Sequence, residues 1–188
     1  MTHKGEAYPA SGAFLLDNPI RRWIQPPSEL VEKMGIAPTD VVVDFGCGPG
    51  YYTIELAKRA KAVVAVDISP AMLQKAQRKA SKTGAKNIQF LQSDGTKIHL
   101  PSASVDKILL VTVYHEVGDS ETVLKEFHRI LKPTGELIIA EVVKKGIFTA
   151  APLQNPEKLK TEIQAADFKF LKIVPYRSYG ILFFNKYA

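Results

Sequence analysis

The residues best suited to chemistry lie in a glycine-rich stretch, Asp44-Phe45-Gly46-Cys47-Gly48-Pro49-Gly50. The stretch follows a run of valines and precedes a segment that we expect to be helical from near Tyr51. Glycines at a strand-to-helix turn permit tight backbone conformations and let a ligand approach the main chain above the helix N-terminus. The stretch therefore predicts a binding loop for a small molecule.

Two details distinguish this loop from a dinucleotide-binding loop. The third glycine of the pattern G-x-G-x-x-G would fall at position 51, where this chain has Tyr51. The carboxylate of Asp44 is directed toward the loop, where it would repel a pyrophosphate and attract a cationic ligand. A Walker phosphate loop is excluded because no G-K-[ST] follows.

Strands and helices alternate along most of the chain and must position this loop. Short runs of β-branched and other apolar residues predict strands at residues 41–43, 62–66, 87–91, 106–111 and 136–141. Ser69 is a plausible cap for a helix whose first residue is Pro70. Such alternation implies right-handed crossovers and a parallel sheet.

The last third of the chain shows a helix and then a different strand pattern. Ser120 begins a helix with Leu131 in its apolar stripe, and Pro133 and Gly135 stop that helix. Residues 156–166 are helical in pattern, and residues 168–175 and 179–185 are strand-like runs only a few residues apart. So short a connection permits an antiparallel hairpin but no crossover helix, and we expect one antiparallel strand at the end of the sheet.

Composition indicates one folded domain. The chain has 188 residues, 46% of them hydrophobic and 23% charged. Its one cysteine, Cys47, excludes an intramolecular disulfide and multi-cysteine metal sites. No apolar run reaches the roughly 18–20 residues that span a bilayer, and the N-terminus is too polar for a secretory signal. We therefore expect a cytoplasmic protein without a transmembrane segment and without a metal.

The net charge of +6 comes from one stretch of the chain. Residues 58–86 contain eight lysines and arginines against Asp67 alone, which gives +7 and leaves −1 for the rest of the chain. Lys75, Arg78, Lys79 and Lys82 lie opposite the apolar stripe of the helix that begins at Pro70. These basic residues are better explained as a solvated helical face than as a surface that binds RNA or an anionic membrane, because no aromatic residues are interleaved with them.

Residues 42–50 resemble the first signature motif of the class I S-adenosylmethionine-dependent methyltransferases. Residues 93–95, 100–106 and 124–135 match further signatures of this family, although Thr134-Gly135 replaces the usual double glycine. The resemblance covers residues 28–141 and is strongest to the small ubiquinone/menaquinone C-methyltransferase-like proteins, the methyltransferase type 11 group. It implies a Rossmann-like, doubly wound α/β sheet of seven strands in the order 3-2-1-4-5-7-6, with strand 7 antiparallel and helices on both faces.

The resemblance also implies the cofactor, S-adenosylmethionine, with S-adenosylhomocysteine as product. Asp67 matches the acidic residue that holds the ribose hydroxyls, Ile68 the apolar residue on the adenine, and Asp94 the carboxylate that meets the adenine amino group. The residues expected to contact the cofactor are Asp44, Gly46, Cys47, Gly48, Tyr52, Asp67, Ile68, Met72, Asp94, Gly95 and Thr112. Simpler interpretations exist: Asp67 as a helix cap, Asp94 as a turn residue and Cys47 as inert loop filling.

Methyl transfer from a sulfonium is an in-line displacement, so the enzyme must hold the acceptor near the methyl group and exclude water. We expect the acceptor at the carboxyl end of the sheet, where the strand order switches between strands 1 and 4. His115 follows the fourth strand there and is the candidate catalytic base or acceptor-positioning group. The alternative is a packed loop histidine, and Glu116 would either orient His115 or cap the next helix.

These interpretations combine into one methyltransferase domain, residues 1–188. Residues 1–27 form an N-terminal flap or leader, residues 28–141 the cofactor-binding core, and residues 142–188 a C-terminal helix and antiparallel hairpin. Arg21, Arg22 and Trp23 would either cover the acceptor or lie on a solvated first helix. The expected acceptor is a small molecule. The missing [DNS]-P-P-[YF] tetrad argues against amino methylation of DNA or glutamine, and the missing cysteines argue against cytosine C5 and arsenite methylation. RNA or protein acceptors, and a non-catalytic protein that binds the cofactor, remain alternatives. A monomer and a homodimer are equally compatible with the sequence.

Overall fold

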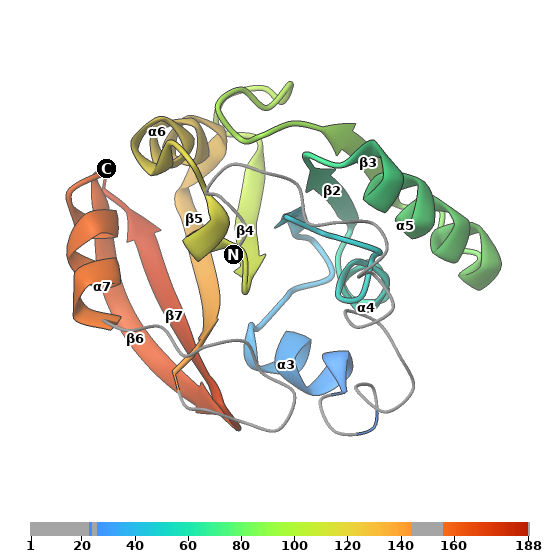
Figure 1. Cartoon of the computed structure of the whole chain (residues 1–188), viewed down its shortest axis with the longest axis horizontal. Helices are drawn as coiled ribbons and strands as arrows, with labels where there is room; N and C mark the ends of the chain where they lie inside the picture. The colour runs from blue at the N-terminus through green and yellow to red at the C-terminus, as the bar shows by residue number, and fades with distance from the viewer. Residues whose placement is uncertain (1–22, 24–25, 144–155, 188) are drawn as a thin grey trace.

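A computed structural model of the chain describes residue 23, residues 26–143 and residues 156–187. In it, seven strands form one sheet in the order β3-β2-β1-β4-β5-β7-β6 (Figure 1). In chain order the strands are β1 (Val41–Phe45), β2 (Ala62–Asp67), β3 (Ile88–Gln92), β4 (Val105–Val111), β5 (Leu131–Val142), β6 (Phe168–Tyr176) and β7 (Tyr179–Lys186). Strands β1 to β5 pair in parallel, and β7 is antiparallel to β5 and β6. The predicted strand order and antiparallel seventh strand are confirmed.

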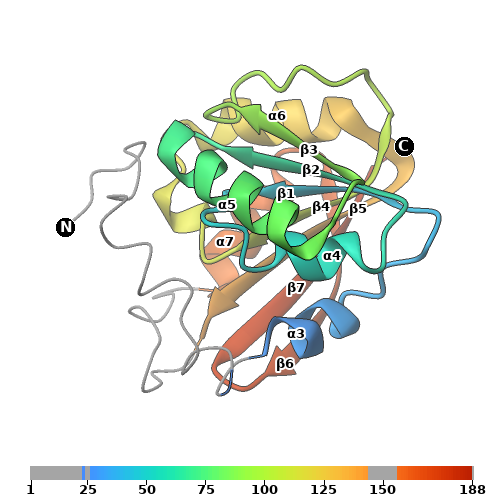
Figure 2. The same ribbon diagram turned by 90° about the vertical axis from the view of Figure 1, so that its right-hand side faces the viewer.

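Helices cover both faces of this sheet, as predicted. They are α3 (Pro27–Lys33), α4 (Thr53–Ala57), α5 (Pro70–Thr83), α6 (Ser120–Ile130) and α7 (Pro156–Gln164), with a short 3-10 helix, η2 (Tyr114–Glu116). Figure 2 shows α5, α4 and α3 in front of the sheet. Successive strand residues face opposite sides, so Val42 packs in the cluster with α3 and α4, whereas Val43 packs in the cluster with α6 and α7. One helix differs slightly from expectation at its start and another at its end: α4 begins at Thr53, and α7 ends at Gln164.

The start of α5 is fixed by the residues that the sequence suggested. The Ser69 hydroxyl accepts a hydrogen bond from the Met72 N–H at 3.4 Å, and Pro70 is the first helical residue. Gly84 ends the helix in a left-handed conformation, with φ of 71°. Only Ile68 separates the end of β2 from the Ser69 cap, so Asp67, the last residue of β2, and Ile68 are held at the carboxyl edge of the sheet.

The fifth strand is longer than predicted. Helix α6 ends at Ile130, and Leu131, which we assigned to the helical stripe, is the first residue of β5 and is fully buried. Pro133 disfavours helical backbone at the residue before it, so the chain becomes extended there. Val105 pairs with Leu131 and Lys107 pairs with Glu136, so the register shifts between these two pairs. The residues of β5 between Leu131 and Glu136, which include the predicted helix stop at Pro133 and Gly135, form a bulge.

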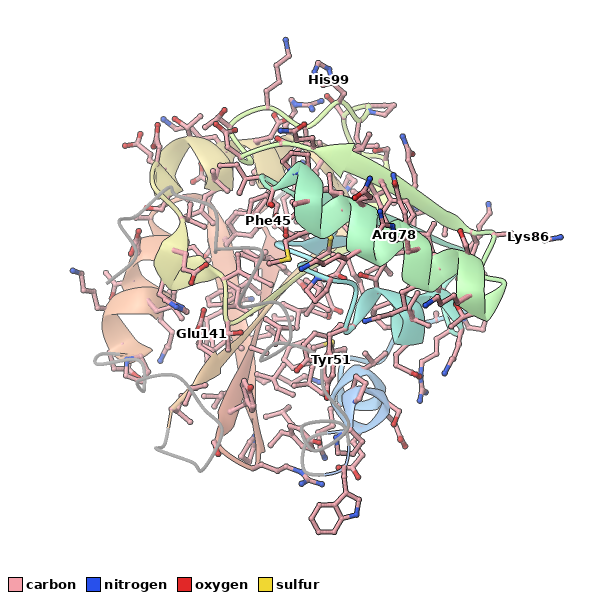
Figure 3. All side chains as sticks on the ribbon, turned by 45° about the vertical axis from the view of Figure 1, so that its right-hand side comes forward. Phe45, Tyr51, Arg78, Lys86, His99 and Glu141 are labelled. Atoms are coloured by element: carbon pink, nitrogen blue, oxygen red, sulfur yellow. The ribbon has the colours of Figure 1, made fainter. Side chains whose placement is uncertain are left out.

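The basic residues of α5 lie as predicted with one exception. Lys75, Arg78 and Lys82 are exposed, and Figure 3 shows Arg78 on α5 and Lys86 extending outward beyond it. Lys79 is half-buried, because it lies on the flank of the stripe formed by Met72 and Ala76. Burial lowers the pKa of its ammonium group to about 8. The prediction of a fully solvated face is therefore wrong at this one residue.

A carboxylate–guanidinium pair on α6 holds the loop between β3 and β4. Glu126 is 9% exposed, and its Oε1 accepts the Ile98 N–H at 2.6 Å. The Nε of Arg129 donates to Oε2 of Glu126 at 2.7 Å, and its second terminal nitrogen donates to the carbonyls of Ile98 and Leu100. The pair thus fixes the segment that follows the Asp94 turn.

Replacing this carboxylate should lower stability in a pH-dependent way. Its hydrogen bonds with Arg129 hold the pKa of Glu126 below its ordinary value, so its stabilisation is present above pH about 4.3 and is lost as pH falls through the folded-state pKa. We expect Glu126→Gln to lower the free energy of unfolding at pH 7 by about 2 kcal/mol, the typical value for hydrogen bonds to a charged group. Urea unfolding at pH 7 and pH 3.5 would measure this, and an equal loss at both values would contradict it.

Candidate functional site

The glycine loop between β1 and α4 adopts conformations that favour glycine. Gly46, Gly48 and Gly50 have φ of 68°, 53° and 79°. A Cβ on Gly46 would lie 2.5 Å from both γ-methyl carbons of Val113, which follows β4, so the loop packs tightly against the neighbouring strand end. A Cβ on Gly48 would meet no described atom within 4 Å. The backbone at Gly48 is therefore open to a ligand.

Asp44 lies at the base of this loop and is buried. It is 3% exposed, and its Oδ2 accepts the Thr53 hydroxyl proton at 2.6 Å. The pKa of Asp44 is raised to about 7, mainly by burial; the Thr53 hydrogen bond opposes the shift and the nearby Asp67 contributes to it. A carboxyl group with this pKa ionises readily when a cation is placed beside it.

The raised pKa of Asp44 predicts that cofactor affinity depends on pH. If Asp44 faces the cationic methionine portion, binding must remove its proton below pH about 7, so affinity should rise with pH up to about 7 and then level off. Calorimetry at pH 6 in buffers of different ionisation enthalpy should detect proton release by the protein on S-adenosylhomocysteine binding. Asp44→Asn should abolish the release. The same release in the variant would show that another group titrates.

Asp67, at the end of β2, ties the strand to the glycine loop. Its Oδ2 accepts the Gly48 N–H and its Oδ1 accepts the Ser69 N–H, both at 2.8 Å. The side chain thus also supports the start of α5, as the simpler interpretation suggested. A carboxylate offers about four acceptor positions, so two remain for a diol such as a ribose. The arrangement fits the nucleoside of the expected cofactor.

The turn that contains Asp94 lies beside Asp67. The Ser93 N–H donates to the Asp67 carbonyl at 3.2 Å, and a Cβ on Gly95 would lie 2.6 Å from the Phe45 ring. Asp94 is exposed, and its Oδ1 accepts both the N–H and the hydroxyl of Thr96. The Asx turn shows a structural role, and the contact of Asp94 with the adenine stays a prediction.

The other predicted cofactor residues differ in their exposure. Ile68, at 37%, is exposed, whereas Cys47, Tyr52 and Met72 are buried. Burial raises the pKa of the Cys47 thiol well above its ordinary value, which agrees with an unreactive loop residue. Tyr52 packs edge-on against the Tyr51 ring, with 4.9 Å between ring centroids. Ile68 is thus the apolar side chain that the structure leaves accessible beside Asp67.

Thr112 has an unusual backbone at the carboxyl end of β4. Its φ is 54°, which is strained for a β-branched residue, and its N–H donates to the Ala140 carbonyl at 2.9 Å. Such strain persists where the surrounding structure imposes it and is often found at functional sites. The conformation redirects the chain from β4 into η2.

His115, the candidate base, lies in η2 directly after this turn. Its side chain is 42% exposed; Nδ1 lies 3.3 Å from Oε2 of Glu141, and Nε2 lies 3.9 Å from Oε1 of Glu116. Burial raises the pKa of Glu116, whereas the nearby His115 lowers it. Figure 3 shows Glu141 in the middle of the molecule, on the sheet. Sequence reasoning did not select Glu141, although it is the penultimate residue of β5, as Asp44 is of β1, and Asp67 is the last residue of β2.

The described residues contain neither a metal-binding cluster nor a membrane-spanning helix. Within residues 23, 26–143 and 156–187, no group of three or more His, Cys, Asp or Glu side chains could hold a metal ion. In the same residues no helix has the length and apolar character needed to cross a membrane. Arg21, Arg22 and most of the predicted flap lie outside the described residues, and Trp23 is 83% exposed.

Comparison with known proteins identifies the class to which this architecture belongs. A family model described as a methyltransferase domain matches residues 36–173. A Bacillus subtilis (strain 168) protein, uncharacterized methyltransferase YdaC, is 31% identical over 146 residues, 74% of each chain. The chain therefore belongs to the methyltransferase domain family, and it is a class I S-adenosylmethionine-dependent methyltransferase whose cofactor is S-adenosylmethionine. The predicted family and cofactor are confirmed.

Two further relatives give the similarity more detail. The demethylmenaquinone methyltransferase of Tropheryma whipplei (strain Twist) is 33% identical over 119 residues, 63% of this chain and 48% of the relative, so this chain spans about half the length of that relative. The crystal structure of a SAM-dependent methyltransferase from Aquifex aeolicus superposes with a TM-score of 0.85 at 26% identity, over 95% of this chain and 98% of that one.

Proposed function

We propose that this methyltransferase acts on a small-molecule acceptor that binds at the carboxyl ends of β4 and β5. The observation that carries the proposal is the charge of this edge. Glu116 and Glu141 lie beside His115 there, and Asp67 at the end of β2 is close enough to Glu116 to raise its pKa. Carboxylates repel the phosphates on which nucleic-acid binding depends. A relative named demethylmenaquinone methyltransferase is in keeping with a small acceptor.

We assign the cofactor to the glycine loop and its neighbours. Asp67 holds the ribose hydroxyls beside the Gly48 N–H, Asp44 faces the cationic methionine portion, and Ile68 and Asp94 border the adenine. The cofactor supplies a methyl group on a positively charged sulfur. His115 positions the acceptor or accepts its proton, because an in-line displacement needs a base only when the acceptor must lose a proton.

The walls of the acceptor site are assigned to the segments around the core. Residues 1–27 and 142–155 are assigned to the acceptor site because all the residues assigned to the cofactor lie between them; most of the two segments lie outside the described residues. This assignment keeps residues 1–188 as a single domain. A cytoplasmic location and a monomeric or dimeric state stay predictions.

Transfer of tritiated methyl from S-adenosylmethionine into a fractionated cell extract would test the acceptor class. We expect label in the small-molecule fraction, and none there with Asp67→Ala. Label in the RNA or protein fraction would overturn the proposal, and would direct attention to the exposed Lys75, Arg78 and Lys82 of α5. Binding of S-adenosylhomocysteine without transfer into any fraction would favour a non-catalytic protein.

A further inference from the structure

Glu141 is a carboxylate placed inside the sheet, near the end of β5. It is 3% exposed, and in the ladder it pairs with Gly180 of β7. A buried carboxylate is costly unless hydrogen bonds or an opposite charge compensate it. Its Oε1 accepts the Tyr114 N–H at 3.1 Å, and its Oε2 lies 3.3 Å from Nδ1 of His115. Both contacts reach the junction between β4 and η2.

This geometry favours a proton on Nδ1 of His115, because Glu141 lies 3.3 Å from Nδ1 whereas the Glu116 carboxylate lies 3.9 Å from Nε2, beyond hydrogen-bond distance. An ionised carboxylate only accepts hydrogen bonds, so the ring nitrogen that faces Glu141 must be the donor. When the imidazole is neutral, a proton on Nδ1 leaves the lone pair on Nε2. Glu141 therefore makes Nε2 the basic atom of His115.

We propose that Glu141 is a positioning residue that holds His115 as a base, and that the acceptor is consequently a hydroxyl compound, an alcohol or a phenol. The proposal rests on the proposed function, namely that the acceptor binds beside His115. The acceptor oxygen forms a bond to the methyl carbon while the carbon–sulfur bond breaks and its electron pair stays on sulfur. The hydroxyl proton goes to Nε2 of His115, so the products are a methyl ether, neutral S-adenosylhomocysteine and an imidazolium.

Two physical arguments favour this acceptor class. A neutral amine attacks with its own lone pair, and a thiol with a pKa near 8.5 is already partly ionised near neutrality, whereas a phenol with a pKa near 10 is mostly protonated and gains most from a base. The positive charge lost at sulfur reappears on His115, where the Glu141 carboxylate at 3.3 Å stabilises it.

Glu141→Gln is the decisive variant because it reverses the tautomer while nearly preserving shape. The amide oxygen must still accept the Tyr114 N–H, so it takes the Oε1 position, 3.4 Å from Nδ1, and the amide nitrogen takes the Oε2 position, 3.3 Å from Nδ1. The amide nitrogen is then the nearer group and donates to Nδ1, which favours the proton on Nε2. In serine proteases, the corresponding acid-to-amide change beside the catalytic histidine lowers kcat about 10⁴-fold, because the histidine is held in the wrong tautomer.

Nitrogen-15 NMR of the S-adenosylhomocysteine complex, at alkaline pH, measures the tautomer without any acceptor. We expect protonated Nδ1 in the wild type and in the control Glu116→Gln, and protonated Nε2 in Glu141→Gln. Protonated Nε2 in the wild type would overturn the positioning role. Because this outcome is measured on the wild type alone, it tests the positioning role of Glu141 even if the variant folds poorly.

The acceptor class is tested with the labelled small molecule from the extract. We expect the methyl group on oxygen and a kcat at least 100-fold lower for Glu141→Gln, with little change in KM. Label on nitrogen, sulfur or carbon would overturn the hydroxyl class and leave the small-molecule proposal intact. Label in RNA or protein would instead overturn the proposed function itself.

Discussion

Asp67→Ala is expected to weaken S-adenosylhomocysteine binding by about 100- to 1000-fold. The variant removes the acceptor positions that Asp67 offers to a ribose and also releases the Gly48 N–H that it orients. Hydrogen bonds to a charged group contribute about 1.5–3 kcal/mol each, and 1.4 kcal/mol is tenfold in affinity. Isothermal titration calorimetry on the purified protein measures this loss directly.

Ser69→Ala is the matched control for this experiment. Asp67 also accepts the Ser69 N–H, so part of its effect could come from the start of α5 rather than from the ligand. Removing the Ser69 hydroxyl deletes the cap on Met72 and should cost about 1 kcal/mol of stability while leaving cofactor affinity nearly unchanged. An Asp67→Ala protein with wild-type affinity would refute the ribose assignment.

Gly46→Ala should lower the free energy of unfolding by about 2–5 kcal/mol. A left-handed conformation costs a residue with a Cβ about 1–2 kcal/mol, and forcing an atom into packed surroundings costs about 1–3 kcal/mol more. Here the new Cβ would lie 2.5 Å from the γ-methyl carbons of Val113, in a loop with φ of 68°. Urea unfolding followed by circular dichroism measures the loss.

Gly48→Ala separates packing from ligand contact in the same loop. Its φ of 53° carries the conformational cost, but the new methyl group meets no described atom within 4 Å. We therefore expect a stability loss of about 1–2 kcal/mol, together with a clear loss of cofactor affinity because the methyl group occupies the space open to the ligand. Equal stability losses for the two variants would show that the Val113 contact is unimportant.

The strand order could be predicted because local signals and the family pattern agreed. Asp44 and Asp67 each follow a buried β-branched run, and Ser69-Pro70 marks the start of α5 without ambiguity. The fifth strand was predicted too short, because Leu131 continues the helical spacing of α6. Its pairing with Val105, 26 residues earlier, is a tertiary contact that no local pattern contains.

The candidate site was predictable in its cofactor half more than in its acceptor half. The glycines of the loop are regularly spaced in the sequence, and that spacing indicates the left-handed residues Gly46, Gly48 and Gly50. The loop then brings the Gly48 N–H to Asp67. Glu141 and His115 are 26 residues apart, and only the side-by-side pairing of β4 and β5 brings them together. Lys79 was misjudged for a related reason: helical spacing gives the direction of a side chain but not what packs against its flank.

The position of β7 has a consequence for how the chain folds during synthesis. It follows the six other strands of the sheet in chain order, yet it lies between β5 and β6 rather than at an edge. Until it is synthesised, β5 presents an unpaired edge next to the apolar side chains of Leu137 and Ile139, and β6 has no neighbour in the sheet. Unpaired strand edges are templates for aggregation. The nascent chain is thus exposed to misassociation on the ribosome until β7 emerges, and a chaperone that covers the edge of β5 would protect it during that interval.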